Sequence, residues 1–221
     1  MQGIFVLYFS LIAFQILRRK RQRLNIVLSG FFISIIIANL LNMIYVVISD
    51  NATVLVLNFL TNFLLCFGPV FIFMVNMIIL ESTLIFSVKR QNRYILGYGI
   101  IAFLGMLIIL IFFEGVNFDM GYPVWEPLFF WYVVLVSTCF AVFPFFYTAL
   151  KIYFSFQTKA LKKKWFYYII GSLGVFSIGY MAFINNLLAN QTFRLILSVY
   201  GISVIIWGYL IYYGIGFKLK Q

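Results

Sequence analysis

The 221-residue chain is 65% hydrophobic and only 10% charged, with a mean hydropathy of +1.08. A water-soluble protein needs a far more polar surface, so this composition excludes a soluble fold and indicates a membrane protein. The net charge of +11 is not a signal for nucleic acid, because it lies beside apolar runs, where anionic cytoplasmic lipids attract it.

The apolar runs predict an all-α membrane protein, a seven-transmembrane-helix bundle formed by a single domain over residues 1–221. The expected spans are residues 3–17, 24–48, 54–80, 95–113, 128–150, 165–188 and 195–217. The first is short, because about 15 residues rise only about 22 Å against a hydrocarbon core of about 30 Å. Segment 114–127 contains Gly-Tyr-Pro and Glu-Pro steps, which favour turns over a helix.

Basic and acidic residues alternate between successive spans. The basic clusters are Arg18 to Arg23, Lys89 to Arg93, Lys151 with Lys159 to Lys164, and Lys218 with Lys220. Short cytoplasmic loops keep Lys and Arg, so this pattern predicts an external amino terminus and a cytoplasmic carboxyl terminus. We therefore expect an integral, multi-pass protein of the plasma membrane, in contact with the lipid bilayer and with anionic lipids at its cytoplasmic face.

Several kinds of chemistry are excluded by residue type. The chain has no histidine, which rules out Ser-His triads, HExxH zinc sites and histidine-ligated haem. Its two cysteines, Cys66 and Cys139, lie inside apolar runs and are expected to be buried thiols. The last span has no lysine for a retinal Schiff base. We expect no enzyme activity, no metal site and no cofactor.

Carboxamides recur within three of the predicted spans. They are Asn39 and Asn42, then Asn58, Asn62 and Asn76, and finally Asn185 and Asn186. An amide that faces lipid is costly, so these side chains should face one another, water or a ligand. Two interpretations stay open: hydrogen bonds between helices, each worth about 0.6 kcal/mol, or a polar ligand-binding pocket in the outer half of the bundle.

Three residues are candidates for a conformational switch. Pro69 and Pro144 lie inside predicted spans, where proline kinks a helix. Glu81 is either interfacial and paired with Lys89 or a nearby arginine, or it lies within the hydrocarbon and couples to a proton or cation. Glycines in the last two spans predict close helix packing there. Segment 151–164 is either an amphipathic surface helix or a solvated loop, and it is the best candidate for docking a partner.

Three sequence features resemble the seven-transmembrane sensor region of some prokaryotic histidine kinases. They are Arg18-Arg-Lys-Arg-Gln-Arg23, Lys162-Lys-Lys-Trp165 with Gly171, and Tyr212-Tyr-Gly-Ile-Gly216. The resemblance covers nearly the whole chain, rests on layout and composition, and carries no binding residue. In that family the last span leads into a kinase or another output domain. Here the sequence stops five residues after Gly216, so a sensor requires a separate cytoplasmic partner, or the chain is a shortened form.

The leading hypothesis is a stand-alone seven-transmembrane receptor or sensor that binds a small ligand in the outer half and signals to a cytoplasmic protein. One alternative is a small-solute transporter with the three-one-three layout of SWEET-type carriers, which also has seven spans. Another is a structural or accessory subunit of a membrane complex. The sequence leaves open whether the protein forms a homo-oligomer.

Overall fold

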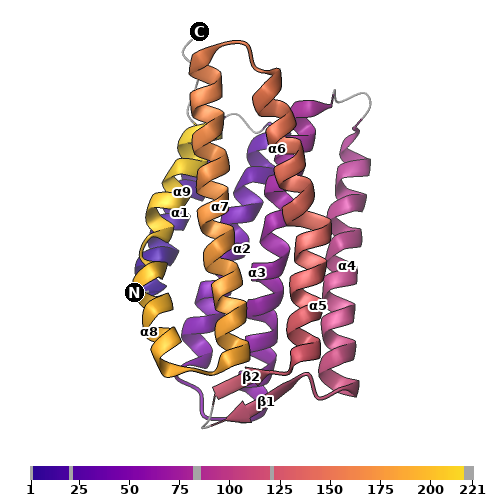
Figure 1. The fold of residues 1–221 in the computed structure, drawn as a ribbon, viewed down its shortest axis with the longest axis vertical. Coiled ribbons are helices and arrows are strands. Elements are labelled where there is room, and N and C mark those ends of the chain that lie inside the picture. Colours follow the sequence, from indigo (N-terminus) through magenta and orange to yellow (C-terminus); the bar gives the residue numbers. More distant parts are fainter. Residues whose placement is uncertain (1, 20–21, 82–85, 120–121, 217–221) are drawn as a thin grey trace.

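Long apolar helices dominate the computed structural model, which describes residues 2–19, 22–81, 86–119 and 122–216 (Figure 1). Five helical runs are long and apolar enough to cross a membrane: α2 (Arg23–Tyr45), α3 (Asn51–Leu80), α4 (Val88–Phe112), the run Pro127–Ser155, and α7 (Lys159–Leu188). α8 (Gln191–Gly201) and the run that begins with α9 (Val204–Ile211) form a sixth if this pair, bent by 42°, is counted as one span. α1 (Gln2–Arg18) is a shorter apolar helix. The protein is therefore a multi-helix integral membrane protein with five to six candidate spans among the described residues.

The predicted spans recur as helices, but several helices extend beyond the predicted bounds. α4 begins at Val88 instead of residue 95, and α7 begins at Lys159 instead of residue 165. Lysine and arginine favour helices and reach water through their long side chains, so a helix can continue past the hydrocarbon into a basic cluster. Only residues 156–158 separate α6 from α7, so segment 151–164 is neither a long loop nor a separate surface helix.

The run Pro127–Ser155 contains an irregular turn near its middle. α5 (Pro127–Ser137) passes into a π-helical turn, η1 (Thr138–Val142), and then into α6 (Phe143–Ser155). Pro144 lies in the first turn of α6 and has no N–H, so it cannot donate to the carbonyl oxygen of Phe140 four residues earlier. The hydroxyl of Tyr94 on α4 donates to that oxygen at 3.0 Å. A side chain on a neighbouring helix thus supplies a hydrogen bond that the proline cannot make.

We expect Tyr94→Phe to destabilise the protein by about 1 kcal/mol, because it removes the interhelical hydrogen bond to Phe140. In the background of Pro144→Ala the loss should be smaller, since residue 144 can then donate to the same carbonyl. Reversible unfolding of the wild type, both single variants and the double variant measures this coupling. Equal costs of Tyr94→Phe in the two backgrounds would contradict the assignment.

The described residues between 114 and 126 form the two strands of a β-hairpin and no helix, as predicted for segment 114–127, but the strands themselves were not predicted, and α5 already begins at Pro127. β1 (Val116–Asp119) pairs with β2 (Tyr122–Trp125) in antiparallel register, with Val116 opposite Trp125. Trp125 is buried and packs against Phe129 and Phe183, with ring centroids 4.9 and 5.6 Å apart. The hairpin therefore closes one end of the bundle, between α5 and α7.

The two ends of the bundle differ in charge. We call the end with β1, β2 and the α7–α8 turn the hairpin end, and the end with the α6–α7 turn the basic end (Figure 1). Among described residues, Arg194 on α8 is the one Lys or Arg at the hairpin end, where its guanidinium lies 4.4 Å from the ring centroid of Tyr122. The described members of the other basic clusters lie at the opposite ends of the helices, so among these residues the charges that alternate along the sequence are separated in space; Lys218 and Lys220 lie outside the described residues.

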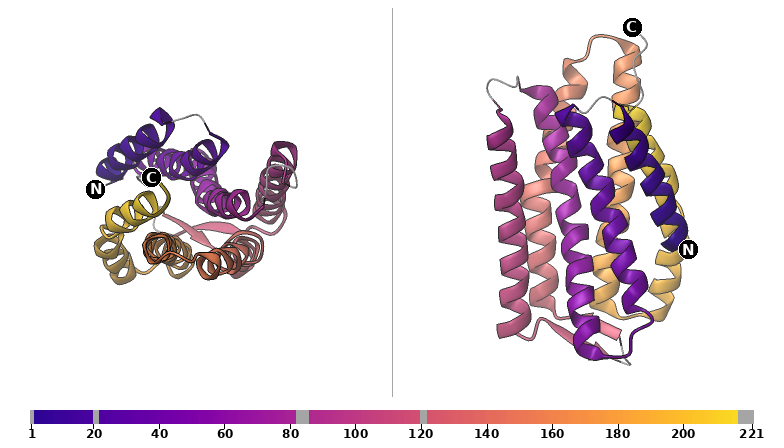
Figure 2. Two further views of the ribbon diagram at one scale, coloured as in Figure 1. Left: turned by 90° about the horizontal axis from the view of Figure 1, so that it is seen from above. Right: turned by 180° about the vertical axis from the view of Figure 1, so that it is seen from behind.

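α1 and α9 close the bundle laterally. The Tyr8 hydroxyl donates to the carbonyl oxygen of Ile205 at 2.9 Å, and Arg19 donates to the Tyr212 hydroxyl. In Figure 2 the first and last helices lie on the same side of the molecule, with α2 and α7 next to them. The helices at the two ends of the described chain, α1 and α9, are therefore in contact along one side of the bundle.

Asp50 caps the amino-terminal end of α3. Its Oδ2 accepts hydrogen bonds from the backbone N–H of Thr53 at 2.8 Å and from the Thr53 hydroxyl at 2.6 Å. The cap lets α3 begin at Asn51, so the predicted start at residue 54 came too late. The hydroxyl bond, followed by the backbone bonds, lowers the pKa of the Asp50 carboxyl below its usual 3.8.

This lowered pKa predicts a pH dependence of stability. A carboxyl whose folded pKa is depressed stabilises the folded state above its unfolded pKa, and that contribution is lost as the pH falls through the folded value. Asp50→Asn keeps an acceptor oxygen but cannot ionise. We expect the wild type to have the higher melting temperature from about pH 5 upward, and the difference to vanish in acid. A difference that is constant with pH would contradict the assignment.

Candidate ligand-binding site

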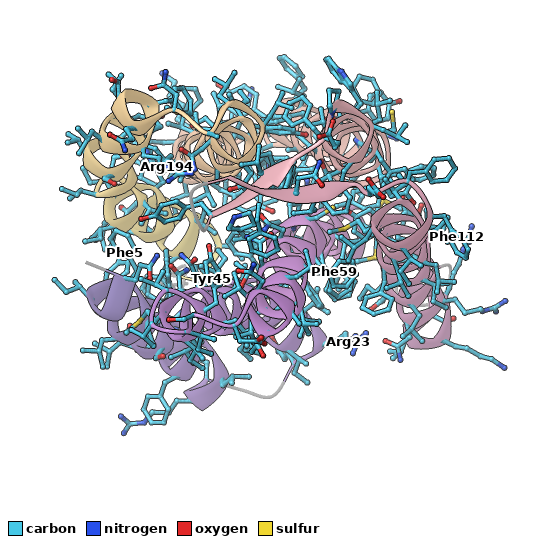
Figure 3. All side chains as sticks on the ribbon, turned by 90° about the horizontal axis from the view of Figure 1, so that it is seen from below. Phe5, Arg23, Tyr45, Phe59, Phe112 and Arg194 are labelled. Atoms are coloured by element: carbon cyan, nitrogen blue, oxygen red, sulfur yellow. The ribbon has the colours of Figure 1, made fainter. Side chains whose placement is uncertain are left out.

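A cavity of about 710 Å³ lies between α1, α2 and α3 on one side and α7 and α8 on the other. Its volume is within the range of about 300–1,000 Å³ typical of small-molecule sites. Figure 3 views the bundle from the hairpin end, with Phe5 of α1 on one side of this region and Arg194 of α8 on the other. Phe5 belongs to the cavity lining, whereas Arg194 does not.

The lining is mainly apolar and carries no charged side chain among the described residues. Phe9, Phe31 and Phe176 are buried residues of this lining. The polar lining residues are Gln2, Asn39, Asn42, Ser137, Tyr180 and Ser198. The cavity can therefore hold an apolar body and hydrogen-bond a small uncharged polar group, but it offers no counter-ion.

The glycines of the last two spans differ in what they do. A Cβ on Gly171 would lie 2.7 Å from the carbonyl oxygen of Trp207, and one on Gly174 would lie 2.2 Å from the Trp207 ring. At Gly179 and Gly201, both in the cavity lining, a Cβ would meet no atom within 4 Å. The predicted close packing is thus confirmed at the first two glycines and wrong at the other two, whose missing side chains enlarge the cavity.

The seven predicted asparagines do not form one pocket. Asn39 and Asn42 line the cavity, and the other five lie outside its lining. The Nδ2 of Asn39 donates to the carbonyl oxygen of Ile35 at 2.9 Å, and its Oδ1 takes part in no hydrogen bond within the described part of the chain. The side-chain amide of Asn42 forms no hydrogen bond with any residue that the structure describes, although its backbone carbonyl accepts from the N–H of Val46. These two amides keep hydrogen-bonding capacity for a ligand.

Three other asparagines connect α3 to α7 near the hairpin end. Asn62 donates to the backbone oxygen of Asn58 at 2.8 Å, and Asn186 donates to the Oδ1 of Asn62 at 3.1 Å. Asn58 and Asn62 are buried. The bond between Asn186 and Asn62 joins α7 to α3, which agrees with the first of the two interpretations of these asparagines, hydrogen bonds between helices.

Asn76 lies apart from the others, in a fully buried contact between α3, α6 and α7. Its Nδ2 donates to the carbonyl oxygen of Phe145 and to the Thr148 hydroxyl, both at 3.0 Å. Its Oδ1 accepts from the Tyr168 hydroxyl at 3.0 Å. Every polar atom of this amide has a partner, so its role is to join three helices.

Four buried polar atoms lack a hydrogen-bond partner within the described residues. They are Thr61 Oγ1, Glu81 Oε2, Trp125 Nε1 and Asn185 Oδ1. Three of the four belong to the hairpin half of the bundle, where internal water or a ligand can satisfy them. The ion pair expected of Glu81 with Lys89 or a nearby arginine is not seen within the described part of the chain. Glu81 is the C-cap of α3, and its backbone N–H donates to the carbonyl oxygen of Met77.

The two predicted hinge prolines lie at or near the cavity wall, whereas Glu81, the third switch candidate, is not part of the lining. Pro69 is part of the lining, and Pro144 follows the turn η1, whose Val142 is part of it. Ser137, which precedes η1, also lines the cavity, and the Tyr180 hydroxyl lies 2.6 Å from the Thr138 hydroxyl. The irregular turn is therefore in direct contact with the candidate site, and π-helical turns often occur at functional sites.

The apolar part of the lining was not predicted from sequence. Phenylalanine makes up 28 of the residues, so no pattern distinguishes the few that face the cavity. The one usable signal was the pair of glycines at 179 and 201, which was interpreted as packing.

Comparison with family models, with curated proteins and with solved structures finds no match for this chain. What the helices define is a class: an integral, multi-pass membrane protein with a mostly apolar cavity inside its bundle.

Proposed function

We propose that the protein is a seven-helix membrane sensor that binds a small ligand in the cavity and signals at its basic end. In this proposal α1 is the first span and the α8–α9 pair is the seventh, with the hairpin end outside the cell and the basic end in the cytoplasm of a plasma-membrane protein. The positive-inside rule supports this orientation, and so does the resemblance to kinase-associated sensor regions.

The observation that carries the proposal is that the cavity is bordered by parts of the helices that can change shape. The turn η1, the bend between α8 and α9, and Pro69 all contact it or adjoin it. A ligand that fits one arrangement of these elements better than another shifts the population towards that arrangement. A purely structural subunit has no need of irregular helices around a cavity, whereas a carrier also uses interrupted helices at its site, so the flux of the ligand has to distinguish a carrier from a sensor.

The basic end supports a signalling role because it offers a surface for a partner. In Figure 1 the ends of α6 and α7 project beyond those of α2, α3 and α4. Lys159, Lys162 and Lys163 lie on this projection beside Tyr153 and Phe166. A cytoplasmic signalling protein with an acidic surface would be attracted to it.

The proposal is tested by a thermal-shift screen of the purified protein against small metabolites and lipids. A compound that raises the melting temperature of the wild type but not of Gly179→Leu, which fills the cavity, supports the site. Gly97→Leu is the matched control, because a Cβ there also meets no atom within 4 Å and Gly97 is not part of the lining.

A stabilising compound must also change the reactivity of a cysteine placed at residue 159; if the basic end does not respond, the sensor proposal fails. Flux of the same compound into liposomes would instead identify a transporter.

A further inference from the structure

The exposed part of the cavity lining includes residues on the flank between α2 and α8. α8 has no buried residue, and it diverges from α9 by 42°. The lining contains residues of α2 and α8 that are exposed or partly exposed, such as Met43, Leu197 and Ser198. Leu197 and Ser198 lie about 9–10 Å along α8 from its first residue at the hairpin end, at 1.5 Å per residue. That depth corresponds to hydrocarbon and not to water.

The rim of this opening includes the polar residues Ser198 and Asn42, but large exposed apolar side chains flank them. Val46, in the lining, is 69% exposed, and Val199, next to Ser198, is 71% exposed. Exposed valines at a mouth suit contact with acyl chains, whereas a mouth that faces water is expected to have a polar rim. A ligand dissolved in the bilayer therefore has direct access to the cavity.

The interior selects for a neutral polar group. No charged side chain lines the cavity among the described residues, so a buried ionised group would lack a counter-ion and would be strongly disfavoured. Asn39 and Asn42 lie three residues apart on one face of α2, and both can donate and accept. A hydroxyl, ester or amide group of a ligand can form hydrogen bonds with these two side chains.

We infer that the ligand is a single-chain amphiphile with an uncharged hydrogen-bonding head, which enters from the bilayer between α2 and α8. Its chain packs against the apolar lining, and its head binds Asn39 and Asn42. A cavity of about 710 Å³ is in the range that buries a ligand of drug size, which corresponds to one chain and a small head but not to a two-chain phospholipid. This inference rests on the proposed function, because it names the ligand class of the same site.

The test uses the full-length protein in liposomes that contain a monoacylglycerol with a photoreactive diazirine in its chain. After irradiation, mass spectrometry should locate the label in peptides of α2, α7 and α8. The double variant Gly179→Leu/Gly201→Leu should reduce this labelling about tenfold by occupying the space, whereas Gly97→Leu should leave it unchanged. Unchanged melting temperatures show that the variants are folded.

The head is tested separately from the chain. Asn39→Leu with Asn42→Leu should weaken labelling by the monoacylglycerol about fivefold, the equivalent of one lost hydrogen bond, but should not affect a diazirine alkane that has no head. A fatty-acid probe that is ionised at the pH of the assay should label at least about tenfold less than the monoacylglycerol.

Two results would overturn the inference. Labelling spread evenly over the lipid-facing surface of α4, and unaffected by the double variant, would show ordinary contact with bulk lipid. Stabilisation by a water-soluble metabolite that the double variant abolishes, without labelling by the monoacylglycerol, would refute this ligand class while leaving the cavity as the site of the proposed sensor.

Discussion

Gly171→Ala is expected to destabilise the protein by about 2–3 kcal/mol, through overpacking between α7 and α9. The added Cβ would lie 2.7 Å from the carbonyl oxygen of Trp207 and 2.8 Å from the backbone nitrogen of Ile211. Both are backbone atoms, so the clash cannot be relieved by a side-chain rotation, and α9 must move away from α7. Reversible unfolding in mixed micelles, followed by tryptophan fluorescence, measures the loss.

The control for this experiment is the same methyl group at Gly179. That residue is on the same helix, but a Cβ there meets no atom within 4 Å. Alanine favours a helix more than glycine does, so Gly179→Ala should be neutral or should stabilise the protein by up to about 1 kcal/mol. Similar losses at both positions would mean that α7 and α9 are not in contact as described.

Asn76→Leu is expected to cost about 2 kcal/mol, because it removes three buried hydrogen bonds that join α3 to α6 and α7. The loss is modest because the former partners have alternatives: the single hydrogen of the Tyr168 hydroxyl can be donated to the carbonyl oxygen of Ile72, 3.1 Å away, and the carbonyl oxygen of Phe145 lies 3.0 Å from the Thr148 hydroxyl. Asn76→Asp should be worse than leucine at neutral pH, since it would place a charge in a fully buried site.

A double-mutant cycle with Tyr168→Phe tests whether this contact is the cause. The two substitutions should cost less together than the sum of their separate losses, because each breaks the same bond between Asn76 and Tyr168. Asn39→Leu is the matched control: within the described part of the chain the Asn39 amide bonds only to a carbonyl of its own helix, so its loss should stay within about 0.5 kcal/mol. Strict additivity of the first two substitutions would argue against the contact.

Individual elements show how far the sequence could predict this structure. The apolar runs located the described helices, and the Pro and Gly steps correctly excluded a helix from the described residues between 114 and 126, but they did not reveal that two parts of this segment pair as strands. The helix cap formed by Asp50 was not predicted, because turns and helix caps use the same short polar side chains. Of the predicted site residues, Asn39, Asn42 and Pro69 line the cavity, whereas Asn76 belongs to a separate contact between helices.

The sequence by itself determined that this is a multi-pass membrane protein, where its helices lie in the chain, and that its charge is concentrated in alternate loops. These properties follow from local hydropathy and charge, which do not depend on what the neighbouring helices are. Only the tertiary structure decided which glycines pack and which leave space, which amides bond to other helices and which face the cavity. The physical reason is that these helices are apolar on nearly every side, so no periodic polar face marks the direction in which a residue points. That direction is set by contacts such as those of Trp207 with Gly171 and Gly174, between residues far apart in the chain.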